Sequence, residues 1–237
     1  MNAVYSYKIV DSALKDADRK KRIVKGYFAA FNIKDSDGDI IRPGAFAKTI
    51  AENGPDSTRP RIKHILNHWP SQPLGRLKSL TEDAHGLLYE SEIGTHDLGN
   101  DFLKMVDSGL ITEHSIGYRI MKEEQDRENE INYLNELKLW EGSSLTAWGA
   151  NEFTPLVSAK GNDVDMLEKK MAAIEDFCKN SDATDETIEL LLLQVKQLHQ
   201  YIIDLKNSTE PRIGTQPRKD MGEKYAKAIS DIHALFV

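Results

Sequence analysis

The stretch EHSIGYR, from Glu113 to Arg119, decides how the rest of the chain is interpreted. Its residues predict a β-strand that begins near Ser115. Ser115 is then either an ordinary residue at the start of a strand or a nucleophile. A serine hydroxyl is a weak nucleophile until a nearby base takes its proton. The chain must therefore supply a base, and a group that orients it, before Ser115 can be given a chemical role.

Short strand-like segments surround this stretch on both sides. Strands are predicted at 22–31, 61–68, 74–80, 86–93, 115–125, 131–143 and 145–150. Helices are predicted at 43–53 and 97–110, the second of them stopped by Gly109. The segment DSDGD at 35–39 predicts a tight turn in which Gly38 can adopt a positive φ, and not a calcium loop, because the twelfth position is Phe46. This pattern predicts an α+β fold: a mostly antiparallel β-barrel or sandwich with peripheral helices.

The pattern becomes helical after about residue 160. Apolar residues recur every three or four positions from Leu167 to Cys178 and again from Ile188 to Leu205, which predicts a helical hairpin or coiled coil over 161–206. The segment 207–220 has two prolines and no apolar period, so it is interpreted as an exposed linker. The last segment, 221–237, is predicted to be an amphipathic helix. The predicted domain division is 1–160 followed by these three segments.

Composition limits the classes of function. A net charge of −7 argues against a general nucleic-acid binder. No window approaches the roughly 20 apolar residues of a membrane span, and the first residues lack the apolar core of a signal peptide. A single cysteine, Cys178, excludes an internal disulfide and a zinc site with several cysteines. We therefore expect a soluble protein of a reducing cytoplasm, without a metal or a cofactor.

Seven histidines could supply the base. His114 is the neighbour of Ser115, and neighbours on a strand point to opposite faces, so it is poorly placed. His64 and His68 are four residues apart, but their segment is strand-like and lacks the glutamate of a helical HExxH metal site. His64, His68 and His114 stay open as candidate bases at this point. Three further histidines are interpreted as surface residues: His85, His199 and His233.

Five segments, in this order, resemble the tailed-phage prohead (capsid maturation) serine protease family. They are FNIKDSDGDIIRPGAFAKTI, ILNHWPSQPLGRL, HGLLYESEI, GLITEHSIGYR and LKLWEGSSLTAWGANEFTP. The resemblance covers roughly 23–155, and the order of the five segments makes it specific. It implies a fold like that of the herpesvirus assembly protease, in which a β-barrel is wrapped by helices and carries the serine and histidine.

The resemblance also implies a catalytic set. The family histidine, at the end of an apolar strand before xxxxPxGR, falls on His68, the serine of SIGY on Ser115, and the acid of LxExSxV on Glu141. Ser115 would attack a peptide carbonyl, His68 would accept and later donate its proton, and Glu141 would orient the imidazole. The adjacent Ser143 and Ser144 are interpreted as strand or turn residues.

Two departures from the family pattern concern tryptophans. Trp148 and Gly149 stand where relatives more often have a proline-containing turn, and Trp69 stands where an aspartate is frequent. Donors for an oxyanion are expected from backbone amides near Gly117 or from a water held by Arg119.

The resemblance implies a serine endopeptidase of the host cytoplasm that acts inside an immature capsid. Its expected substrates are extensions of the major capsid protein and scaffold segments. A homo-oligomer, in particular a dimer formed through the barrel or the helical tail, is expected, as is self-cleavage within 207–220 or near 158–162. The alternative is a non-catalytic assembly or scaffolding protein that keeps the barrel and binds capsid subunits through its tail.

Overall fold

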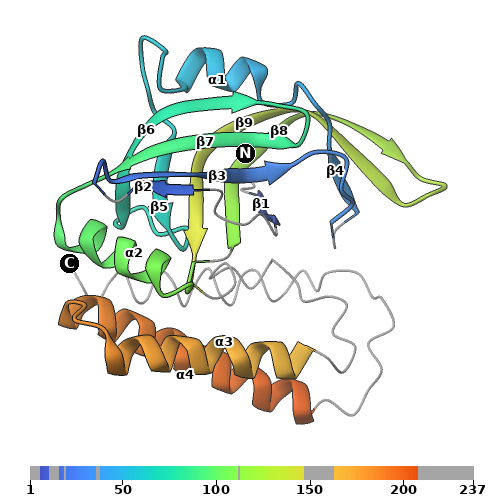
Figure 1. The fold of residues 1–237 in the computed structure, drawn as a ribbon. Coiled ribbons are helices and arrows are strands. Elements are labelled where there is room, and N and C mark those ends of the chain that lie inside the picture. The colour runs from blue at the N-terminus through green and yellow to red at the C-terminus, as the bar shows by residue number, and fades with distance from the viewer. Residues whose placement is uncertain are drawn as a thin grey trace, which may run out of the picture. The chain divides into compact units, whose positions relative to one another are not determined.

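The computed structural model describes residues 6–10, 16–18, 20–35, 38–111, 113–146 and 163–207. The chain divides into two compact units, Met1–Ile202 and Ile203–Val237. The first unit contains all the described strands and helices apart from the last residues of the final helix (Figure 1). Of the second unit, the description covers only the end of that helix.

The elements follow one another as strands with two inserted helices and then a helical pair. The strands are β1 (Ser6–Val10), β2 (Asp16–Asp18), β3 (Ile23–Ala30), β4 (Asp39–Ile41), β5 (Lys63–Leu66), β6 (Pro73–Glu82), β7 (Gly86–Ile93), β8 (Glu113–Asp126) and β9 (Ile131–Leu145). The helices are α1 (Ala47–Asn53), α2 (Asp97–Asp107), α3 (Asp163–Asn180) and α4 (Asp185–Asn207).

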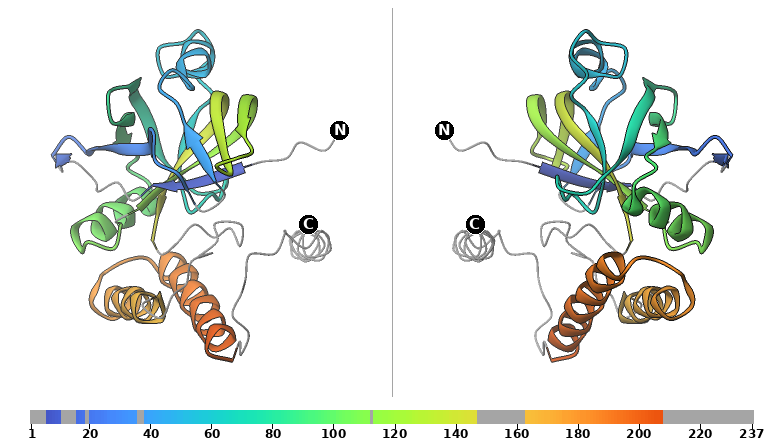
Figure 2. Two further views of the ribbon diagram at one scale, coloured as in Figure 1. Left: turned by 90° about the vertical axis from the view of Figure 1, so that its right-hand side faces the viewer. Right: turned by 90° about the vertical axis from the view of Figure 1, so that its left-hand side faces the viewer.

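One nine-stranded sheet forms a nearly closed barrel in the first unit (Figures 1 and 2). Its strand order is β1-β8-β9-β5-β6-β7-β3-β2, and β4 pairs with β9 outside this path. The sheet curls so that β3 comes close to β1 and β8. Neighbouring strands are antiparallel, apart from two parallel pairs that β9 forms with β4 and with β5. The pairing of β9 with β8 is antiparallel. The predicted barrel with peripheral helices is thus confirmed as a mixed α/β fold with a barrel-like sheet and, among the described residues, four helices.

Aromatic rings fill the interior of the barrel. Phe28 of β3 stacks on Tyr89 of β7, with ring centroids 3.8 Å apart. His64 of β5 and His114 of β8 lie against the same cluster, and Phe102 of α2 contacts the His64 ring from one end. Helices α1 and α2 lie at opposite ends of the barrel (Figures 1 and 2). This core fixes which side of each strand faces inward, and so which side remains for chemistry.

The predicted strands and helices before residue 146 are present with shifted boundaries. The segment 86–93 is β7 with the predicted bounds. Gly38 has the positive φ expected of it, 87°, and Gly109, which was predicted to stop the second helix, lies just after α2 with a φ of 74°. The separate strand predicted at 145–150 is wrong at its start, because Leu145 is the last residue of the long strand β9. Residues 147–150 lie outside the described residues.

Three strands were not predicted: β1, β2 and β4. Two of them are only three residues long, DAD and DII, and so short a segment carries no period that a sequence pattern could reveal. They form because longer neighbours, β3 and β9, offer paired backbone groups.

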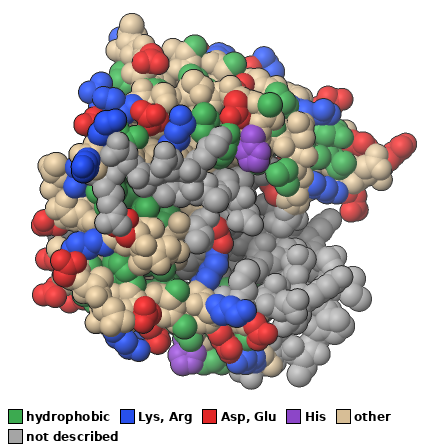
Figure 3. All heavy atoms as spheres, in the orientation of Figure 1, with side chains coloured by type: hydrophobic (Ala, Val, Ile, Leu, Met, Phe, Trp, Pro, Cys, Tyr) green, Lys and Arg blue, Asp and Glu red, His purple; other side chains and the backbone are tan. Residues whose placement is uncertain are grey.

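The predicted helical pair at 161–206 corresponds to α3 and α4, while a coiled coil and the domain division remain predictions. The predicted linker and final helix lie outside the described residues, apart from Asn207 at the end of α4. None of the helices described here is both long and apolar enough to cross a membrane. On the face drawn in Figure 3, acidic and basic side chains are interspersed.

Candidate active site

The ladder between β8 and β9 places four candidate residues on one face of the sheet. Ser115 pairs with Ser143, and Gly117 pairs with Glu141. Directly opposed residues of an antiparallel pair share a face, and side chains alternate along each strand. His114, Ile116 and Ser144 therefore point into the barrel. Ser115, Ser143 and Glu141 lie on the other face, where Gly117 has no side chain.

A β-bulge in β9 sets the direction of Glu141. Gly117 is paired with Glu141 and Tyr118 with Leu139, so Trp140 is the extra residue that the bulge inserts into β9. A bulge of this kind changes the alternation locally and is common next to active sites. Leu139 is buried at 2% exposure in the core, while Glu141 reaches the face that carries Ser115. Without the bulge, Leu139 and Glu141 would point to the same face of the sheet, and the extra residue between them lets them point to opposite faces.

The absence of a side chain at Gly117 leaves room for the Glu141 carboxylate. A Cβ added at Gly117 would overlap Oε1 of Glu141. The carboxylate therefore lies over the backbone of β8, two residues from Ser115 along the strand. The close approach of the Glu141 side chain, and not a positive φ, is what favours glycine at this position.

His68 and Glu141 are joined by a short hydrogen bond. Nδ1 of His68 lies 2.6 Å from Oε1 of Glu141, and the hydroxyl of Ser143 donates to Oε2 at 2.7 Å. Because a carboxylate only accepts, Nδ1 of His68 carries the proton. The Ser143 hydroxyl also accepts the backbone N–H of His68 at 3.1 Å. Histidine, glutamate and serine thus close a ring of hydrogen bonds.

A strained turn brings His68 to this ring. Strand β5 ends at Leu66, and both Asn67 (φ 51°) and His68 (φ 60°) adopt the left-handed conformation. Asparagine and histidine tolerate this region better than most residues. The N–H of Asn67 donates to the carbonyl of Ser144 at 3.0 Å, which fixes the turn to β9. The chain therefore reverses where β5 meets β9, beside Ser143.

Ser115 is fully buried, and its hydroxyl has no hydrogen-bond partner among the described residues. It lies opposite Ser143, the residue that contacts both His68 and Glu141. The structure thus brings His68 and Glu141 into contact and places Ser115 on the same face of the sheet. The roles of the three residues remain a prediction.

The two other candidate bases lie on the opposite face. Nε2 of His64 is 2.9 Å from the Ser144 hydroxyl, and Nε2 of His114 is 2.7 Å from the hydroxyl of Tyr89, both inside the barrel. Burial, and next the nearby His114, lower the pKa of His64 well below its usual value. Neither ring is directed toward Ser115. His64 and His68 also do not face one another as a metal pair would.

Ser143 is the residue that the sequence interpretation undervalued. It was interpreted as an ordinary strand or turn residue, yet it contacts both the acid and the histidine turn. The available signal was its spacing: in a strand, residue 143 shares a face with residue 141. Arg119 is exposed, and the donors of an oxyanion hole remain a prediction.

A histidine that donates to a carboxylate, on the face that carries a buried serine, is the arrangement used by serine peptidases. Residues 8–170 match the family described as Caudovirus prohead serine protease. The match covers more than half of the chain, and the chain belongs to this family.

Two curated relatives are similar over most of the same region. The chain is 30% identical over 149 residues to the prohead protease of Enterobacteria phage HK97, a match that covers 62% of this chain and 64% of the relative. It is 28% identical over 162 residues to the prohead protease of Escherichia phage T5, covering 67% and 75%. The match thus spans slightly less than two thirds of the HK97 protein.

A solved structure is also similar to this one. It is the capsid assembly protease of bacteriophage T4, with a TM-score of 0.44 and 12% identity, covering 60% of this chain and 96% of that one.

Proposed function

We propose that this protein is a serine endopeptidase that cleaves extensions of capsid or scaffold proteins during prohead maturation. The observation that carries the proposal is the hydrogen bond between His68 and Glu141 on the face of the sheet that holds Ser115. Membership of the prohead serine protease family, and the names of its two relatives, support it. The proposed place of action is the interior of the procapsid, in the host cytoplasm.

The mechanism follows from the proton on Nδ1. Because Nδ1 keeps its proton and donates it in a hydrogen bond to Glu141, Nε2 is the nitrogen of His68 that acts as the base. As the Ser115 oxygen attacks the peptide carbonyl, Nε2 takes the hydroxyl proton and then gives it to the departing amine. A water molecule then attacks the acyl-enzyme by the same route and releases the acid product and Ser115.

Glu141 stabilises the charged imidazole that forms in each half-reaction. Its side chain is only 12% exposed, so water screens the interaction weakly. Ser143 holds the second carboxylate oxygen, which keeps the carboxylate directed at Nδ1. This part of the site is preorganised before any substrate binds.

A fluorophosphonate probe, which labels activated serines, tests the proposal together with cleavage of a peptide from a capsid-protein extension. Ser115→Ala and His68→Ala should lower turnover on the order of 10⁴-fold or more while both variants stay folded. Glu141→Gln should retain measurable activity, because Glu141 orients the base and transfers no proton.

The matched control is Ser144→Ala, which removes the neighbouring serine that points into the barrel. Its folded fraction should be labelled like the wild type. Labelling that persists in Ser115→Ala would overturn the assignment of the nucleophile. A folded wild-type protein that neither labels nor cleaves would favour the non-catalytic assembly protein.

We also propose self-processing within 207–220 or near 158–162, and a homodimer as the working form. Both cleavage ranges lie outside the described residues, and the basis is the exposed linker that the sequence predicts. Intact-mass measurements on concentrated wild type and Ser115→Ala should show loss of a C-terminal fragment in the wild type alone. Equal, stable masses under conditions where the wild type cleaves a substrate peptide would contradict self-processing.

A further inference from the structure

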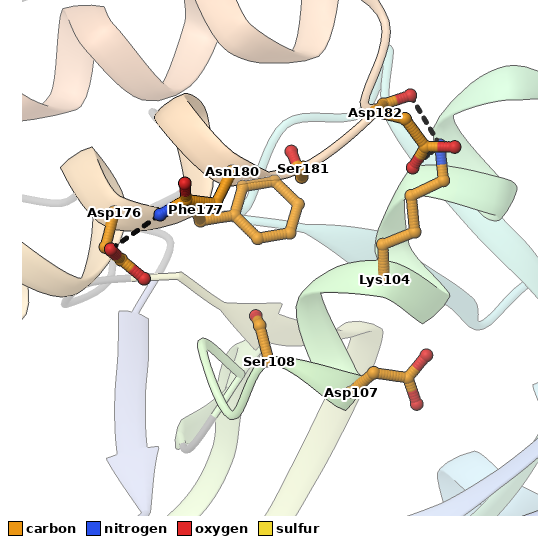
Figure 4. Close-up of a pocket in the computed structure, with 8 residues that line it drawn as sticks. All are labelled: Lys104, Asp107, Ser108, Asp176, Phe177, Asn180, Ser181 and Asp182. Atoms are coloured by element: carbon orange, nitrogen blue, oxygen red, sulfur yellow. Dashed lines mark hydrogen bonds and ion pairs between the residues drawn. The ribbon is translucent and has the colours of Figure 1, made fainter.

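Polar contacts between described residues attach the helical pair α3 and α4 to the barrel, and they include two ion pairs and one buried hydrogen bond. Lys170 of α3 forms an ion pair with Glu113, two residues before Ser115. At the turn between the helices, Lys104 of α2 pairs with Asp182 at 3.0 Å, and both residues line the pocket drawn in Figure 4. The third contact is the hydrogen bond between Gln194 of α4 and the residue just after β9. It differs from the others because all its members are buried.

This third contact is the end of a chain of hydrogen bonds. The Thr146 hydroxyl donates to Oε1 of Gln194 at 2.6 Å and accepts from Nδ2 of Asn67 at 3.0 Å. The backbone N–H of Thr146 donates to Oδ1 of Asn67, also at 3.0 Å. Exposure is 0% for Asn67, 3% for Thr146 and 8% for Gln194. Water therefore competes little for these bonds.

At its other end, this chain of hydrogen bonds reaches Asn67, the residue before His68. Asn67 and His68 are consecutive left-handed residues, a conformation that persists only where the surroundings hold it. Two supports come from β9, namely the Ser144 carbonyl and the Ser143 hydroxyl. A third support is Thr146, which binds both ends of the Asn67 amide and is itself held by Gln194.

We propose that Gln194 is a positioning residue for catalysis: through Thr146 and Asn67 it holds the turn that directs His68 at Glu141 and Ser115. The α3–α4 pair is then part of the catalytic unit, and not only a tail for assembly. The inference rests on the proposed function, because it assigns His68 as the base. It extends that function to a helix far from Ser115 in the sequence.

The test uses the full-length chain and pairs of matched variants. Gln194→Met keeps the size of the side chain and removes the acceptor, and Thr146→Val keeps the shape and removes the hydroxyl. Each should lower kcat for a peptide substrate about tenfold, with KM changed less than twofold. Thr146→Ser keeps the hydroxyl, so this variant should retain most of the wild-type kcat. The double variant should be no slower than the slower single variant, because both break the same chain.

Thr184→Val is the control for loosening the helical pair in general. Thr184 binds Oδ2 of Asp101 through its hydroxyl at 2.7 Å, at the turn between α3 and α4, and has no contact in the chain to Asn67. This variant should unfold at a lower temperature and keep the kcat of the wild type. If it slows turnover as much as Thr146→Val does, attachment of the helices matters but the hydrogen-bonded chain does not, and the proposal fails.

A second measurement does not depend on turnover. The proton between His68 and Glu141 should give a downfield imidazole NMR signal, which would be assigned by its loss in His68→Gln. Gln194→Met should shift or broaden this signal, and Thr184→Val should leave it unchanged. A wild-type signal and a wild-type kcat in Gln194→Met would overturn the inference. Absence of serine labelling in the wild type would instead contradict the proposed function, and the NMR result would still decide the role of Gln194.

Discussion

At the scale of single residues, the closest neighbour of the proposed triad is Ser143. Its hydroxyl donates to Glu141 and accepts from the backbone of His68, so one side chain fixes the acid and the turn of the base together. The adjacent Ser144 has the same chemistry but points into the barrel, to His64. Direction in the strand, and not residue type, separates their expected effects.

We predict that Ser143→Ala lowers kcat about tenfold with little change in KM. The variant removes a donor from the Glu141 carboxylate and leaves the His68 N–H without its acceptor, which also costs about 1–3 kcal/mol of stability. Ser143→Thr keeps the hydroxyl and should recover most of the activity. The measurement is steady-state turnover alongside urea unfolding. Equal losses of kcat in the folded fractions of Ser143→Ala and Ser144→Ala would remove the special role of Ser143.

At the scale of elements, the ladder between β8 and β9 decides where the acid lies. The bulge at Trp140 turns Glu141 toward Ser115, and Gly117 leaves the space that the carboxylate occupies. We predict that Gly117→Ala lowers kcat about tenfold, because the new Cβ displaces the carboxylate from His68. The free energy of unfolding should fall by about 1–3 kcal/mol, because the displaced carboxylate loses its buried hydrogen bonds to His68 and Ser143.

A double variant shows whether Gly117 acts through Glu141. Added to Glu141→Ala, the Gly117→Ala change should produce no further loss of turnover, because the displaced group is already gone. Additive losses in the double variant would mean that the alanine disturbs Ser115 or the substrate directly.

The elements also show what sequence patterns can and cannot predict. Every second residue of strand β7 is buried from Leu87 to Ile93, and the bounds of this strand were predicted correctly. The bulge at Trp140 inserts one residue without any change in composition, so the pattern does not reveal it. The left-handed turn at Asn67 and His68 is likewise fixed by contacts with β9, which lies about 75 residues away in the sequence. The resemblance indicated three site residues, but only the fold reveals that Ser143 contacts two of them and that Gln194 and Thr146 are linked to the neighbouring Asn67.

At the scale of the whole molecule, the aromatic interior of the barrel holds a buried titratable side chain, His64. His64 is fully buried against Phe28, Tyr89 and His114, and burial lowers its pKa well below 6.5. In the unfolded chain the same residue binds a proton near pH 6.5. Below that pH the unfolded state therefore holds more protons than the folded state, and acid favours unfolding.

We predict that the contribution of His64 to the free energy of unfolding is at its maximum above about pH 6.5 and falls as the pH drops below that value. The slope from His64 alone approaches about 1.4 kcal/mol per pH unit and continues down to its lowered folded-state pKa. Urea unfolding at pH 7.5 and pH 5.5 measures the difference. His64→Gln keeps a side chain able to bind Ser144 and cannot titrate, so its difference between the two pH values should be smaller by about 1 kcal/mol. Because the other histidines are common to both proteins, an equal difference in wild type and variant would show that His64 is not the group responsible.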